Sequence, residues 1–287
     1  LGVLGYLAST PSTDSPRLIA LYPRIELLRD QVATLLANLK NLGHSTGNAL
    51  TVGVLYGEVP RDRKAAEYSK HQKWVKRNDG LECPIVGCLK ESCNGKLIWL
   101  NEDGENQVLT CESCQAKLRS LIFTRDALSR QPPDVLVATT EMLNRSLSFG
   151  SPSRRLFVGT RGSSPEFLLL DEIHTYSGVH GAQIAHVIRR WKNQVWNKNV
   201  HIVGLSATLA DPNGFFSDLT GLFPHQVEVV APREEELRDT GRQYFLALRG
   251  DPASKTALLA TTIQASMLVR RMLDQSLGTP SDGIFGS

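Results

Sequence analysis

An apolar run that ends in two adjacent carboxylates constrains the fold of this chain more than any other feature. Leu168, Leu169 and Leu170 come directly before Asp171 and Glu172. An uninterrupted apolar run is typical of a strand buried on both faces in a parallel sheet. The carboxyl ends of such strands form the edge at which open α/β proteins bind ligands, and carboxylates there suit magnesium. We therefore expect a parallel α/β sheet that presents Asp171 and Glu172 at its ligand-binding edge.

A second apolar strand, ending at Leu205, is followed by Ser206, Ala207 and Thr208. In a phosphate-hydrolysing site, the first carboxylate of the pair holds the metal through water, and the second orients or deprotonates the attacking water. We therefore assign catalytic roles to Asp171 and Glu172, and ATP and Mg²⁺ are the cofactors that this chemistry requires.

Strands and helices alternate along the chain in the manner of parallel βαβ units. We expect one domain over residues 1–230, then a charged linker and the beginning of a second domain over 231–287, with a strand at Gln243–Leu248 and a helix at Lys255–Leu277. The strands expected in the first domain are Arg17–Tyr22, Leu50–Leu55, Asp134–Ala138, Phe167–Leu170 and Val200–Leu205, and its helices are Ile25–Leu42, Thr140–Leu147 and Val179–Val195.

All five cysteines lie in one short segment, which predicts a zinc-ribbon insertion at residues 78–120. Cys111 and Cys114 form a CxxC pair and are the firmest ligands. Two of Cys83, Cys88 and Cys93 complete the site, and the spacing does not decide which two. An expected hairpin, Lys96–Leu100 with Gln107–Thr110, separates the two clusters. Disulfides are the alternative, but nothing else in the sequence indicates an oxidising compartment.

Composition is that of an ordinary globular protein, with 41% hydrophobic and 21% charged residues and a net charge of +3. No apolar run approaches the roughly 18 residues of a membrane helix, so we expect no membrane partner. Basic residues gather between Pro60 and Arg77. This stripe either follows a phosphate backbone or is a solvated helix face, and the segment alone favours neither interpretation.

Four segments together resemble a known motor family. Asp171-Glu172-Ile173-His174 and Ser206-Ala207-Thr208 resemble motifs II and III of superfamily 2 helicases of the DExH type. Leu21–Gln31 and Val137–Leu143 resemble motifs Ia and Ib. The resemblance implies a RecA-like fold, coupling of hydrolysis to strand movement by His174, Ser206 and Thr208, and nucleic-acid contacts by six residues: Pro23, Arg24, Gln31, Thr139, Thr140 and Glu141.

The stretch from Asp171 to Trp191 resembles bacterial helicases of the mitomycin-repair type and the large helicase of the DISARM anti-phage system. This resemblance implies a cytoplasmic DNA motor whose partners are DNA, a second motor domain of the same chain, and repair- or defence-complex proteins. Gly178 and Gly181 would let the loop after motif II turn tightly. For Arg189 and Arg190, a solvated helix face is slightly favoured over a contact with nucleic acid or the partner domain.

One departure from the family pattern is serious, because no G-x-x-x-x-G-K-[ST] phosphate loop occurs in the sequence. Leu1–Ala8 has the character of a helix whose start is missing, and Gly283–Ser287 is uncapped, so we expect a piece of a longer protein. The chain alone is then expected to bind ATP poorly and to hydrolyse none. Two alternatives stay open: a degenerate motor that only binds nucleic acid or protein, and an RNA helicase.

Overall fold

The computed structural model describes residues 2–11, 13–46, 50–68, 73–148, 150–207, 209–232, 236 and 262–270. The chain divides into two compact units, Leu1–Val229 and Val230–Ser287. In the second unit, the predicted strand Gln243–Leu248 lies outside the described residues. Of the predicted helix Lys255–Leu277, residues 262–270 are described and are helical. The assignment of this unit to a second motor domain stays a prediction.

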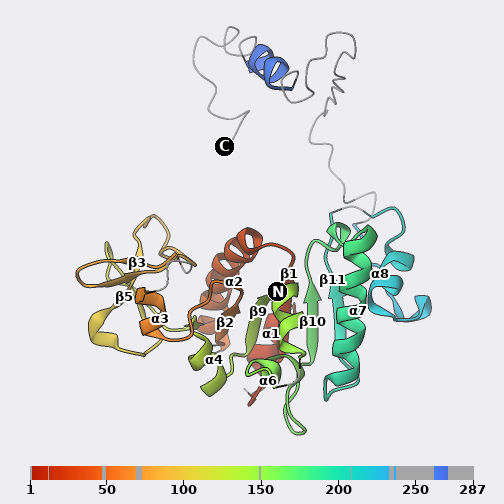
Figure 1. Ribbon diagram of the computed structural model, residues 1–287, viewed down its shortest axis with the longest axis horizontal. Helices are drawn as coiled ribbons and strands as arrows, with labels where there is room; N and C mark the ends of the chain where they lie inside the picture. Colours follow the sequence, from red (N-terminus) through yellow and green to blue (C-terminus); the bar gives the residue numbers. More distant parts are fainter. Residues whose placement is uncertain are drawn as a thin grey trace. The chain divides into compact units, whose positions relative to one another are not determined.

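A six-stranded parallel sheet forms the centre of the first unit (Figure 1). The expected parallel α/β fold of the RecA-like class is therefore confirmed. In spatial order the strands are β11 (His201–Gly204), β10 (Phe167–Leu170), β1 (Leu18–Tyr22), β9 (Val135–Thr139), β2 (Val52–Leu55) and β8 (Leu121–Ile122).

Helices cover both faces of this sheet. Alternate residues of β1 separate the two cores: Leu18, Ala20 and Tyr22 face α1 and α2, whereas Ile19 and Leu21 face the remaining helices. The helices are α1 (Gly2–Ser9), α2 (Ile25–Thr46), α4 (Arg125–Arg130), α5 (Thr140–Ser146), α6 (Arg154–Val158), α7 (Gly178–Gln194) and α8 (Pro212–Thr220), with 3₁₀ turns η2 (Ile173–Thr175) and η3 (Pro224–Gln226).

Local signals in the sequence explain where several helices begin and end. The apolar stripe of α7, with Ile184, Ile188 and Trp191 buried, has the i, i+4, i+7 spacing of one helix face. Helix α8 begins at the N-cap Asp211, whose carboxylate accepts from the backbone N–H of Gly214, and it ends at Gly221 in the left-handed conformation.

The cysteine-rich insertion is a five-stranded antiparallel sheet that follows α3 (Arg63–Tyr68). It begins at Val75, slightly before the expected residue 78, and leads through Ser120 into β8 at the edge of the main sheet. Its elements are β3 (Val75–Lys76), β4 (Gly80–Glu82), β5 (Leu97–Leu100), η1 (Asn101–Asp103), β6 (Leu109–Cys111) and β7 (Lys117–Leu118).

Aromatic packing holds this ribbon against the motor core. Trp99 lies 4.9 Å from Phe123 between ring centroids, and Trp74 packs against both rings. Trp99 belongs to the ribbon, whereas Phe123 directly follows β8 of the parallel sheet. Trp99 and Phe123 are fully buried, so their contact provides hydrophobic and edge-to-face stabilisation at the junction.

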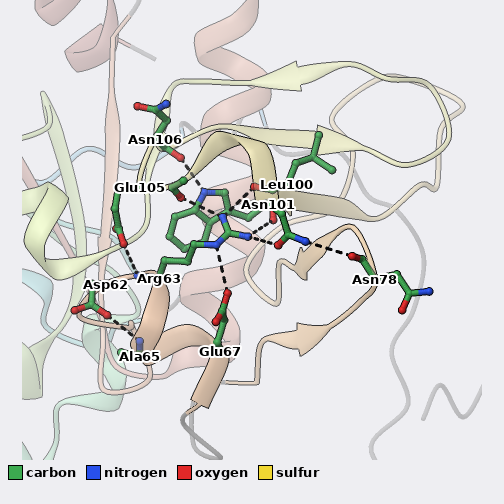
Figure 2. A network of polar contacts seen from close by, with 11 residues as sticks. Asp62, Arg63, Ala65, Glu67, Asn78, Leu100, Asn101, Glu105 and Asn106 are labelled. Carbon is green, nitrogen blue, oxygen red and sulfur yellow. Dashed lines mark hydrogen bonds and ion pairs between the residues drawn. The ribbon is translucent and has the colours of Figure 1, made fainter.

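Arg63 adds polar contacts between α3 and the ribbon beside these rings. Its guanidinium lies 4.7 Å from the ring centroid of Trp99 and donates hydrogen bonds to the carbonyl oxygens of Trp99, Leu100 and Gly104 (Figure 2). It also pairs with Glu67 one helical turn further along α3. Arg63 belongs to the basic stripe of the sequence, but its side chain is buried in this network and faces neither solvent nor a phosphate backbone.

We expect Arg63→Met to destabilise the unit by about 3 kcal/mol, because it removes the hydrogen bonds to the buried carbonyl of Trp99 and to the partly buried carbonyls of Leu100 and Gly104, and it leaves Glu67 without its ion pair. The midpoint of urea unfolding, followed by tryptophan fluorescence, measures the effect. The exposed neighbour Lys64 provides the matched control, since its side chain forms no hydrogen bond or ion pair among the described residues. Equal midpoints for the two variants would contradict a fastening role for Arg63.

Candidate functional site

The parallel register brings the predicted motif residues to one edge of the sheet. Leu170 pairs with Leu21 of β1 on one side and with Gly204 of β11 on the other. Asp171 therefore lies between the ends of the strands that lead to Pro23 and to Ser206. The backbone N–H of Asp171 donates to Leu21 O at 3.0 Å, which extends the pairing to the first carboxylate itself.

The second carboxylate has an unusual backbone. Glu172 has φ 49° and ψ 45°, the left-handed conformation that non-glycine residues rarely adopt. Such conformations cluster at functional sites, where the surrounding structure imposes them. The backbone N–H of Glu172 donates to Asp171 Oδ1 at 3.0 Å, so the two acids are held as one turn.

His174 connects the two motifs. Its Nδ1 lies 3.2 Å from Glu172 Oε2 and 3.3 Å from Ser206 Oγ. One imidazole nitrogen thus contacts both the expected catalytic carboxylate and the serine that follows β11. Thr208, also predicted to couple hydrolysis to movement, lies outside the described residues. His174 therefore connects Glu172 to Ser206 through a single nitrogen atom.

Two buried tyrosines surround Asp171, and sequence reasoning missed both. Burial raises the pKa of Tyr22 and of Tyr176, and the nearby charge of Asp171 raises both further. Burial likewise raises the pKa of the Asp171 carboxyl. Tyr22 is the last residue of β1, and Tyr176 directly follows the 3₁₀ turn η2. Their positions were visible in the sequence, but tyrosine at a strand end carries no signal of its own.

Gly181 at the start of α7 is required by a close approach, as expected. A Cβ at this position would lie 2.2 Å from the carbonyl oxygen of Tyr176. Gly178, the first residue of α7, has φ +57°. The loop after motif II is therefore drawn tightly onto the helix that follows it.

The predicted nucleic-acid residues lie on two neighbouring strand ends. Tyr22 and Thr139 are register partners, so Pro23 and Arg24 lie beside the start of α5. Thr139 Oγ1 accepts from the Met142 N–H as the N-cap of α5, and Thr139 and Thr140 are both buried. The exposed members of the set are Arg24, Gln31 and Glu141.

Arg189 and Arg190 of α7 both have protein partners. Arg189 Nη2 donates to the carbonyl oxygen of Asp218, and Arg190 Nη2 donates to the backbone and side-chain oxygens of Asn144. Arg190 thus ties α7 to α5. Both arginines are also exposed, as a solvated helix face requires, so these hydrogen bonds add protein contacts to the interpretation that the sequence slightly favoured.

Four of the five cysteines gather at one point of the ribbon. The Sγ atoms of Cys88, Cys93, Cys111 and Cys114 all lie within 4.8 Å of one another. Cys88 Sγ lies 3.6 Å from Cys114 Sγ, and Cys93 Sγ lies 3.7 Å from Cys111 Sγ. Tetrahedral thiolates about 2.3 Å from zinc are separated by about 3.8 Å, so this arrangement suits a structural zinc ion.

The spacing did not decide which two of Cys83, Cys88 and Cys93 complete the site, and Cys83 is the one that lies apart from the cluster. It is buried in the core beneath the ribbon, where its sulfur accepts a weak hydrogen bond from the Ile85 N–H. Burial raises the pKa of the Cys83 thiol to about 11. A thiol that stays protonated is a poor metal ligand, so Cys83 behaves as a small apolar core residue.

Comparison with known proteins finds similarity to helicases. Residues 98–214 match the family model for the DEAD/DEAH box helicases. The chain is similar to two uncharacterized ATP-dependent helicases. It is 38% identical to YprA of Bacillus subtilis (strain 168) over 58 residues, which are 20% of this chain and 8% of YprA. It is 27% identical to MJ1574 of Methanocaldococcus jannaschii over 142 residues, which are 49% of this chain and 19% of MJ1574.

Among solved structures, the chain is similar to the DUF1998 helicase MrfA bound to DNA. The sequence identity is 18%, the TM-score is 0.40, and the match covers 72% of this chain and 20% of MrfA. The resemblance of this chain to superfamily 2 helicases is thus confirmed by the matching family model. The segment that matches the DEAD/DEAH box helicase model, residues 98–214, contains Asp171, Glu172, His174 and Ser206.

Among the described residues, no helix has both the length and the apolar character needed to cross a membrane.

We expect the purified chain to contain about one zinc ion and to lose it on Cys114→Ser, since a tetrahedral site needs all four thiolates. Metal content by atomic absorption measures this directly. Cys83→Ala is the matched control and should retain the ion, because Cys83 lies outside the cluster. Loss of zinc in Cys83→Ala alone would show that the ligand set is wrong.

We expect Asp171→Asn to stabilise the chain at neutral pH. Burial raises the pKa of Asp171, so the folded protein binds this proton more tightly than the unfolded chain does. Ionised Asp171 therefore opposes folding, and this cost disappears as the pH falls below about 3.9, the pKa of aspartate in an unfolded chain. The melting temperatures of variant and parent should differ at pH 7 and converge toward about pH 3, where the carboxyl is protonated in both states. Exposed Asp14→Asn is the control.

Proposed function

We propose that this chain is the first motor domain of a longer ATP-dependent DNA helicase or translocase. The observation that carries the proposal is the contact of His174 Nδ1 with both Glu172 and Ser206. Such a bridge is what a motor needs, because hydrolysis must be communicated from the reacting acid to a second strand end. A module that only bound nucleic acid would have no use for it.

Each residue of this edge has a distinct part in the proposed reaction. Asp171 would hold magnesium through water, and the metal would supply neutralisation of the phosphate charge of bound ATP. Glu172 accepts the proton of the attacking water. The left-handed turn at Glu172 directs its carboxylate toward His174, so the gain of a proton by Glu172 weakens its contact with the imidazole.

The same edge supports a nucleic-acid contact. Arg24 is exposed after β1, and the N-terminus of α5 lies beside it. The buried hydroxyl of Thr139 caps this helix, which leaves the arginine and the first backbone N–H groups to meet phosphates. Pro23, Gln31, Thr140 and Glu141 shape the same surface. Contacts of this kind do not distinguish DNA from RNA.

The ribbon and the missing phosphate loop complete the proposal. Zinc would hold the ribbon through Cys88, Cys93, Cys111 and Cys114, with a structural role because four thiolates leave no open position. The sequence contains no phosphate-loop lysine motif, so we infer that this chain alone hydrolyses no ATP. DNA repair and phage defence are the processes that the family resemblance suggests.

The deciding experiment measures ATP hydrolysis by the parent protein with single-stranded DNA, duplex DNA or RNA added. We expect DNA to stimulate turnover, and Glu172→Gln to reduce it by at least about a hundredfold, as for loss of a general base. Glu228→Gln, an exposed and unpaired acid among the described residues, is the matched control and should retain turnover.

Other outcomes of this experiment are equally informative. Stimulation by RNA alone would make the protein an RNA helicase. No turnover with any nucleic acid, from folded and zinc-loaded protein, would favour a degenerate motor that serves as a binding module. Hydrolysis by the isolated chain that Glu172→Gln abolishes would contradict the inactivity proposed for this segment.

A further inference from the structure

A pocket of about 670 Å³ lies where the ribbon meets the motor core. The second half of α2 forms one wall, the turn from Cys88 to Lys90 forms another, and β7 with the residues up to Ser120 forms the third. The pocket opens at the amino ends of β2 and β8, since Leu50 and Thr51 line it just before β2 begins. Asp171 follows the carboxyl end of β10, at the opposite edge of the sheet.

Two kinds of side chain dominate the lining of this pocket: leucines and cations. Leucines from all three walls form its floor and sides: Leu36, Leu39, Leu50, Leu89, Leu97 and Leu118. The cations Lys40, Lys90, Lys117 and Arg119 also line it, and all four are exposed. No carboxylate lines the pocket. Among the described residues, none of these four cations forms an ion pair.

The distribution of the cations limits the kind of ligand that fits. Lys40 lies on α2, Lys90 on the cysteine turn, and Lys117 and Arg119 on or beside β7. A single carboxylate, such as that of a fatty acid, would reach only one of these walls. A ligand with several negative charges spaced along an extended chain would meet cations on all three.

Nucleic acid is also polyanionic, but the lining suits it poorly. Single strands bind with their bases stacked on aromatic rings, and no aromatic side chain lines this pocket. Leucine floors instead suit aliphatic side chains of a peptide. β7 is the last strand of the ribbon sheet, so an extended peptide would also lie along a strand edge.

We propose that this pocket binds an acidic peptide segment of a partner protein, with one or two leucine-like side chains in the apolar floor and carboxylates on the surrounding cations. The site is separate from the nucleotide and nucleic-acid edge, and the proposal does not depend on ATP hydrolysis. The occupant is a protein partner whose contact segment is rich in aspartate, glutamate and leucine.

Fluorescence anisotropy of a labelled peptide tests the proposal on the zinc-loaded chain. The probe is a twelve-residue (about 40 Å when extended) peptide in which two leucines are flanked by aspartates and glutamates. Saturable binding is expected, and Lys117→Glu with Arg119→Glu should weaken it roughly tenfold, since two attractive pairs become repulsive. Ala116→Trp should weaken it comparably, because exposed Ala116 lines the pocket and a large ring there fills it.

Controls separate this site from general electrostatic attraction. Arg130→Glu with Arg161→Glu reverses two exposed cations outside the pocket lining and should leave peptide affinity unchanged. Zinc content and urea midpoint confirm that each variant is folded. A peptide with its leucines replaced by serine should bind at least about tenfold more weakly if the apolar floor is used.

Three results would overturn the proposal. If the pocket and the control charge reversals weakened peptide binding equally, the attraction would come from the overall charge of the protein and not from this pocket. Tighter binding of an oligothymidylate than of the peptide, lost in Lys117→Glu with Arg119→Glu, would make the surface a nucleic-acid contact. Unchanged peptide affinity in Ala116→Trp would show that no side chain enters the pocket.

Discussion

The pairing of β10 between β1 and β11 is the constraint on which the candidate site depends. Backbone hydrogen bonds on both sides fix the position at which β10 ends after Leu170, and therefore the point at which Asp171 leaves the sheet. A shift of β10 by one residue would exchange the two cores that its side chains enter and would separate His174 from Ser206. Buried apolar surface on the two faces thus determines the geometry of three polar side chains at one edge.

The strands and the motif edge could be predicted from the sequence because their signals are local. Runs such as Leu168–Leu170 identify a doubly buried strand without reference to the rest of the molecule, and the helix periodicity of α7 is equally self-contained. β8, with two residues, and α3, with six, are too short to produce a periodic signal. Both are nevertheless the elements to which the ribbon attaches.

Other features depend on contacts between residues distant in the sequence. Arginine is usually exposed, and the burial of Arg63 arises only because Trp99 and the carbonyls around it close over α3. The choice among Cys83, Cys88 and Cys93 likewise depends on the folded structure. Their spacings in the sequence are equal, and only Cys88 and Cys93 lie close to Cys111 and Cys114. The burial of Asp171, and the effect of its charge on the pKa of Tyr22 and Tyr176, are also properties of the assembled edge.

The ribbon leaves through β7 and continues within three residues into β8, the outermost strand of the parallel sheet. The ribbon is thus joined along the chain to the outermost and shortest strand of the parallel sheet, in addition to its packing through Trp99 and Phe123. Losing β8 would break only its pairing with β2 and would leave the register of β10 intact. The accessory module and the strand that precedes Asp171 and Glu172 therefore lie toward opposite ends of the sheet order, so a change in the ribbon can be tolerated without a change in the pairing of β10.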